Sequence, residues 1–107
     1  MERSYQLDCP VARTLDLIGE RWTLLILRDF FIKAEVLRFG DFETSLSGIT
    51  PAVLSARLKE LEKKGIIVRK LYSEHPPRME YRLTPFGKTL GPVLKSLREW
   101  GLKHTKR

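Results

Sequence analysis

The fold of this chain is decided by residues 39–65, which read FGDFETSLSGITPAVLSARLKELEKKG. Phe39, Phe42 and Leu46 recur at intervals of three and four, which predicts a short helix of about two turns. Ser47-Gly48-Ile49 follows as the exit turn, because a glycine there permits the backbone conformation that ends a helix.

A second, longer helix begins directly after this turn. Thr50-Pro51 is the residue pair expected at an N-cap and at the first helical position. Leu54, Leu58 and Leu61 then form one apolar stripe that ends before Lys64-Gly65. A short helix, a turn containing glycine and a longer helix together predict a helix-turn-helix over about residues 38–64.

Downstream of Gly65 the pattern changes to that of β-strands. The run at 66–68 is β-branched, and Met79, Tyr81 and Leu83 alternate with polar residues. These two strands enclose a polar loop at 73–78 that contains two prolines. A β-hairpin directly after a helix-turn-helix is a wing, which we place at about 66–84.

Helices are also predicted on both sides of this unit. Residues 10–19 place Val11, Leu15 and Ile18 on one face, with Asp8 as the expected N-cap. Residues 22–31 are apolar on most sides, which is typical of a buried central helix. The stretch 33–37 fits either a continued helix end or a short strand.

A last helical segment follows the wing at about 85–104. Gly91-Pro92 interrupts it, and the proline, which lacks an amide hydrogen, predicts a kink or a break there. The whole pattern predicts an α+β, mainly α fold: one winged helix-turn-helix domain over 1–107 with a two-stranded β-hairpin wing and N- and C-terminal dimerisation helices.

Composition restricts the class of protein. The chain has 107 residues, and its net charge of +7 favours a polyanionic partner. No apolar run is long enough to span a membrane, and the first eight residues lack the hydrophobic segment of a secretory signal, so we expect a soluble protein inside the cell. One cysteine and two distant histidines exclude a disulfide scaffold and a zinc finger. We expect no cofactor, no metal and no catalytic residues.

The outward face of the helix at 50–64 is the candidate surface for base contacts. Opposite the leucine stripe lie Ala52, Ala56, Lys59 and Lys63, with Ser55 at the flank. Small residues followed by cations suit a helix that meets base edges in the major groove and then phosphates. An ordinary solvated helix face is the alternative interpretation.

The wing carries a second set of candidate contacts. Lys70, His75 and Arg78 lie in or beside the proline-containing loop, where a cation can reach a phosphate or the minor groove. Plain solvent exposure of a polar loop is the alternative, and the acidic Glu74 favours that alternative mildly.

Apolar residues near both ends exceed what one small core needs. They either close a single core or face a twin subunit, and we favour a homodimer that reads a pseudo-palindrome. The candidate interface residues are Leu15, Leu90, Leu94, Leu97 and Trp100.

Cys9 is the one residue with conspicuous redox chemistry. It precedes Pro10 near the start of a helix, where the helix dipole favours the thiolate and hence a sensor role. A small buried residue is the commoner role of a free cysteine. An enzyme with Cys9 as nucleophile ranks last, because neither His75 nor His104 looks placed to act as its base.

Several motifs, in order along the chain, resemble the HxlR-type winged helix-turn-helix regulators. The motifs are DCPVA at 8–12, LIGERWTLLILRD at 17–29, RFGDF at 38–42, GIT at 48–50, LSARLKEL at 54–61, YRLT at 81–84 and EWG at 99–101. The resemblance implies a prokaryotic cytoplasmic transcription regulator, activator or repressor, that dimerises through its terminal helices and binds operator DNA. Some members of this family have a cysteine before the same proline and use it to sense electrophiles or oxidants.

The sequence therefore predicts a homodimeric, sequence-specific regulator of double-stranded DNA, open to a small-molecule or electrophile effector. Arg57 and Lys63 are expected to reach phosphates, whereas Ala52, where relatives often have a polar residue, cannot hydrogen-bond a base. The predicted DNA contacts are Thr50, Ala52, Ser55, Ala56, Arg57, Lys59, Lys63, Lys70, His75 and Arg78. The rival hypothesis is a winged-helix module for protein contacts without a specific operator.

Overall fold

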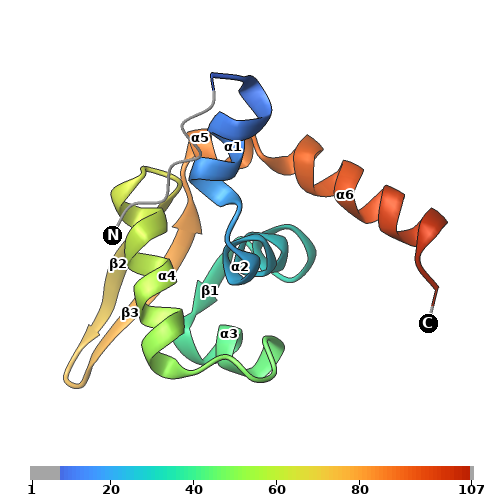
Figure 1. Cartoon of the computed structure of the whole chain (residues 1–107). Coiled ribbons are helices and arrows are strands. Elements are labelled where there is room, and N and C mark those ends of the chain that lie inside the picture. Colours follow the sequence, from blue (N-terminus) through green and yellow to red (C-terminus); the bar gives the residue numbers. More distant parts are fainter. Residues whose placement is uncertain (1–7, 107) are drawn as a thin grey trace.

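The computed structural model describes residues 8–106, so the expectation about a secretory signal, which rests mainly on residues 1–7, lies outside the described residues. The chain forms helices packed on a small antiparallel sheet (Figure 1). The elements are α1 (Pro10–Ile18), α2 (Arg21–Ile32), β1 (Val36–Arg38), α3 (Phe39–Ser45), α4 (Pro51–Lys63), β2 (Ile67–Glu74), β3 (Pro77–Leu83), α5 (Pro85–Lys88) and α6 (Gly91–His104).

The core lies where α2, α3 and α4 meet the sheet. The Phe42 ring is fully buried, and it meets the edges of Phe30 and Tyr81 at centroid distances of 5.6 and 6.2 Å. The prediction that α2 is a buried central helix is confirmed, because Ile26 and Leu27 are completely inaccessible to solvent. Burying side chains of this size stabilises the fold by about 2 kcal/mol each.

The helix-turn-helix has the predicted form. Thr50 caps α4, since its hydroxyl oxygen accepts a hydrogen bond from the Val53 amide at 3.2 Å. Gly48 and Gly65 have φ angles of +92° and +75°, so each supplies a left-handed turn that other residues rarely adopt. The turn at Gly48 leads from α3 to α4, and the turn at Gly65 leads from α4 to β2.

The sheet contains one strand more than the predicted hairpin. Its order is β1-β3-β2, and all neighbouring strands are antiparallel. The ambiguous stretch before residue 38 contributes the strand β1, which pairs Leu37 with Tyr81. The predicted six-residue loop at 73–78 is wrong, because Glu74 pairs with Pro77 and only His75-Pro76 remains as the turn, with a cis peptide bond between them.

The terminal helices differ from expectation in two details. The N-cap of α1 is Cys9 rather than Asp8, and the Asp8 carboxylate instead accepts a hydrogen bond from Arg13 at 2.8 Å. Of the three residues predicted to share a face of α1, Ile18 is buried, but 69% of Val11 is exposed. Apolar surface therefore remains open on this helix.

The predicted break in the C-terminal segment is confirmed. Helix α5 ends at Lys88, and α6 begins at Gly91 with its proline in the first turn, where a missing amide hydrogen costs no helical hydrogen bond. Thr84 starts α5 and ties it to the end of α4, because its hydroxyl group donates to the Gly65 carbonyl at 2.6 Å. Helix α6 projects from the body of the domain (Figure 1), and none of its side chains is fully buried.

Candidate nucleic-acid interface

Helix α4 presents one polar face to solvent. Its leucine stripe is buried against the core, which turns Ala52, Ala56, Lys59 and Lys63 outward, all of them exposed. Ser55 lies at the flank and is half-buried. The helical period places these four positions on one face, where the small residues occupy the N-terminal half of α4 and the lysines the C-terminal half.

The two outward lysines differ from the other cations of this region. Neither Lys59 nor Lys63 forms an ion pair with any residue in the range 8–106. Lys64, by contrast, donates to the carbonyl oxygens of Asp16 and Leu17, both at 3.3 Å. The positive charge on the outward face of α4 is therefore available to an anion from outside.

Arg57, which is predicted to reach a phosphate, forms ion pairs within the protein. Its guanidinium pairs with Glu60 one turn along α4 and approaches Glu20 at 4.0 Å. Glu20 is also the N-cap of α2, where its carboxylate accepts from the amides of Trp22 and Thr23. Arg57 thus ties α4 to the start of α2, because the edge of the leucine stripe where it lies faces the protein.

Three connections fix α4 within the domain. Arg57 holds the beginning of α2, Lys64 holds the end of α1, and Glu62 pairs with Arg69 of β2 at 3.1 Å. Together with the buried leucine stripe, these contacts set the orientation in which α4 presents its outward face.

The wing lies alongside α4, which packs on β2 (Figure 1). His75 lies in the turn, whereas Lys70 and Arg78 stand on the strands themselves rather than in a loop. All three are exposed, and none makes an ion pair with another described residue. Glu74 is also exposed next to them, so the wing tip is mixed in charge.

Two further cations of the sheet, Arg38 and Arg82, are not among the predicted DNA contacts. Arg38 and Lys70 flank Glu80 on opposite sides, and directly opposed residues share a face of a sheet. Arg38 contacts Glu80 at 3.9 Å and lies 4.2 Å above the Tyr72 ring. Arg82 belongs to the same face and has no ion pair in the described range. The alternation at 79–84 indicates that Arg82 lies on the outer face of its strand. The position of Arg38 depends on the pairing of β1 with β3, which has no signal in the sequence.

Cys9 is half-buried at the start of α1. Its Sγ accepts a hydrogen bond from the Ala12 amide at 3.4 Å, which is the N-cap interaction. Among residues 8–106, no hydrogen bond joins this sulfur to a histidine or a carboxylate. The His104 ring lies against Trp100 in a tilted arrangement, with ring centroids 4.7 Å apart.

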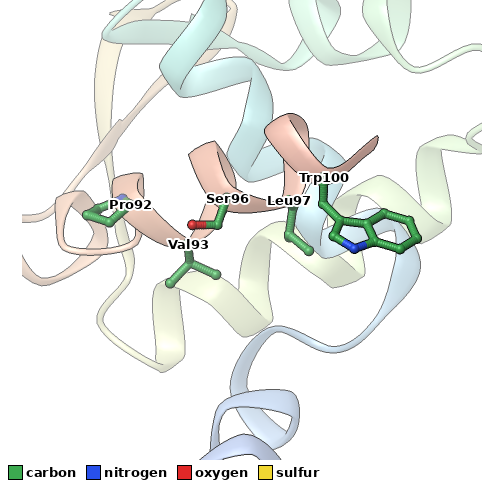
Figure 2. A pocket seen from close by; sticks show the side chains of 5 residues that line it. All are labelled: Pro92, Val93, Ser96, Leu97 and Trp100. Atoms are coloured by element: carbon green, nitrogen blue, oxygen red, sulfur yellow. The ribbon is translucent and has the colours of Figure 1, made fainter. Parts of the chain in front are cut away.

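The apolar residues expected at a subunit interface fall into two groups. Leu90 packs against the core, and Leu94 is half-buried. Leu15, Leu97 and Trp100 are open to solvent, with exposures of 41, 52 and 63%. Figure 2 shows Val93, Leu97 and Trp100 along one side of α6; the shallow apolar depression there is lined by Pro92, Val93, Ser96, Leu97 and Trp100.

Residues 8–106 contain neither a metal-binding cluster nor a membrane-spanning helix. No group of three or more His, Cys, Asp or Glu side chains in the range 8–106 is arranged to hold a metal ion. No helix in that range has both the length and the apolar character needed to cross a bilayer.

Comparison with known proteins identifies the family. The profile of the HxlR-like helix-turn-helix family matches residues 17–107. The uncharacterized HTH-type transcriptional regulator YdeP of Bacillus subtilis (strain 168) is 40% identical over 99 residues, which are 92% of this chain and 76% of that relative.

Solved structures agree with this assignment. The redox regulator HypR in its oxidized form superposes with a TM-score of 0.83 and 38% identity, covering 92% of this chain and all of that one. Its reduced form gives a TM-score of 0.82 and 39% identity over 89% of this chain and 92% of that one. This chain is a helix-turn-helix transcriptional regulator and belongs to the HxlR-like family.

Proposed function

We propose that the protein binds a pseudo-palindromic DNA operator as a homodimer, with α4 in the major groove. The observation that carries this proposal is the outward face of α4, where exposed small residues are followed by the two unpaired lysines Lys59 and Lys63. Ala52 and Ala56 let the helix approach base edges, and a methyl group there can contact a thymine methyl. Thr50 and Ser55 provide hydroxyl groups beside them.

Lys59, Lys63 and the wing supply the phosphate contacts. Lys70, His75 and Arg78 are exposed on a hairpin that runs beside α4, so they can reach the backbone next to the bases that α4 reads. Arg57 serves in this proposal to position α4, since its charge is already paired.

The exposed apolar faces of α1 and α6 form the subunit interface in this proposal. Leu15, Leu97 and Trp100 would be costly to leave in water, and a symmetric dimer buries the same face of both protomers. Two-fold symmetry then places two α4 helices about 34–36 Å apart on one side of the DNA. The protein would act in the prokaryotic cytoplasm, on the nucleoid.

A salt titration of DNA binding tests the operator. The first probe is the DNA just upstream of the protein's own gene and its divergent neighbour, with random duplex of equal length as control. A preference of about 10³-fold or more with a steep salt dependence supports a specific operator. Equal, weak binding to both duplexes contradicts it and favours the rival function, a module for protein contacts.

A thiol response through Cys9 is the second part of the proposal. It is supported by the position of Cys9 at the start of α1 and by the likeness to a protein described as a redox regulator. Diamide or methylglyoxal should change operator affinity in the wild type and leave Cys9→Ser unaffected. Serine is a preferred N-cap residue, so this variant keeps the start of α1 intact. An equal response of both proteins would refute the role of Cys9.

A further inference from the structure

A small notch separates the end of α2 from the sheet and from α5. Its volume is about 160 Å³. It is lined by Phe30, Phe31, Glu35, Arg82, Leu83 and Lys88. None of these residues belongs to the DNA contacts or to the dimer surface proposed above.

Two phenylalanine rings, one buried and one half-exposed, line the notch. Phe30 is 6% exposed and packs edge-on against Phe42 of the core. Phe31 is 39% exposed and lies under the first residue of α6, where a Cβ atom at Gly91 would approach its ring to 3.3 Å. The glycine thus allows this ring to lie between the notch and the start of α6. An occupant of the notch would touch the joint from which α6 projects.

Positive charge dominates the rim of the notch. Arg82 has no ion pair among the described residues, and Lys88 pairs with Glu35 at a distance of 3.9 Å. Both members of that pair are well exposed, with side-chain exposures of 61 and 84%, so solvent screens their attraction. An incoming anion can therefore take over Lys88 from Glu35 and engage Arg82, which presents a planar set of donors suited to a carboxylate.

The volume of the notch limits the apolar part of a ligand to about one aromatic ring. A protein cavity of about 150 Å³ lined by apolar side chains accommodates one benzene ring. The notch has that volume, two phenylalanine rings and two cations. We propose that it binds a one-ring aromatic carboxylate, with the ring against Phe30 and Phe31 and the carboxylate between Arg82 and Lys88. Only the role of such a ligand as an effector rests on the proposed function, because binding itself requires no DNA.

Titration calorimetry of the free protein with benzoate tests the binding. For a ligand of this size we expect saturable binding with a Kd on the order of 1 mM. Arg82→Gln should weaken it by about tenfold, since one charge-assisted contact is lost. Glu35→Gln should strengthen it, because the competing carboxylate is removed. Arg78→Gln, which changes the same residue type on the same strand away from the notch, should leave it unchanged.

Two comparison ligands complete the experiment. Benzamide has the same ring without the charge, and acetate has the charge without the ring; both should bind at least about tenfold more weakly than benzoate. Equal binding of benzoate and benzamide, an unaffected Arg82→Gln variant, or no saturation by benzoate would each overturn the proposal. Because Glu35→Gln is expected to gain affinity, a folding defect cannot imitate the full pattern. The outcome is independent of whether an operator is found.

Discussion

Replacing Lys59 by alanine tests the interface on α4 quantitatively. Among the residues proposed to contact DNA, four are exposed cations without ion pairs to described residues, namely Lys59, Lys63, Lys70 and Arg78, and the proposed dimer doubles that set. Each phosphate contact contributes about 0.9 to the slope of log affinity against log salt concentration, which predicts a slope of about −7 for the wild-type dimer. Lys59→Ala removes one contact per protomer and should bring the slope to about −5.

The same relation gives the loss of affinity. A slope change of about 1.8, counted from a reference concentration of about 1 M salt down to about 0.15 M, weakens binding by about 30-fold. This loss should be the same on the operator and on random duplex. Fluorescence anisotropy at four or five salt concentrations measures both quantities. Lys59→Arg keeps the charge and should retain the slope, whereas Lys33→Ala removes an exposed lysine at the end of α2 and should change nothing.

Two results would refute parts of this reasoning. An unchanged slope for Lys59→Ala would show that the outward face of α4 does not meet phosphates. A change of about 0.9 rather than 1.8 would assign one protomer, not two, to each DNA site. A loss confined to the operator would instead assign Lys59 to a base.

Three further predictions concern assembly and stability. Leu97→Glu places a charge on the exposed apolar side of α6, so light scattering should show a fall from twice 12.5 kDa to 12.5 kDa, and an unchanged mass would exclude that face as the interface. Gly87→Ala puts a Cβ atom 2.1 Å from the Ile66 carbonyl oxygen and should lower the free energy of unfolding in urea by at least about 1–3 kcal/mol; full stability would contradict that packing. Burial raises the pKa of Tyr81 above its usual 10.0, so folding disfavours the phenolate, and stability present below pH 10 is lost as the pH rises past that value. Urea titrations at pH 9 and above should show this loss in the wild type but not in Tyr81→Phe, and identical curves would refute it.

The elements built from local patterns were predictable from the sequence. Thr50-Pro51 and the leucine stripe define α4 without reference to the rest of the chain, and Gly91-Pro92 marks the break before α6. The alternation at 79–83 likewise locates β3. Each of these signals lies within a single element.

Features that depend on distant partners were not predictable. The strand β1 has three residues, too few to show alternation, and it exists because β3 lies beside it. Arg57 meets Glu20, which is 37 positions earlier, so its pairing has no local signature. The wing turn was misjudged because two prolines suggested a loop, although Pro77 is tolerated as the first residue of a strand.

The pairing of β1 with β3 joins two segments that are far apart in the sequence. Val36 is aligned with Arg82, so the helix-turn-helix and all of β2 lie between two segments that hydrogen-bond to each other. Closing a loop of that length is slow and cooperative, and this short ladder should form late in folding. Because β1 has three residues and lies at the edge of the sheet, its amide hydrogens should exchange through a partial opening that detaches β1 from β3, at a lower free energy than the opening of the whole domain. Hydrogen exchange at these three residues therefore reports the detachment of β1 and not the unfolding of the whole domain.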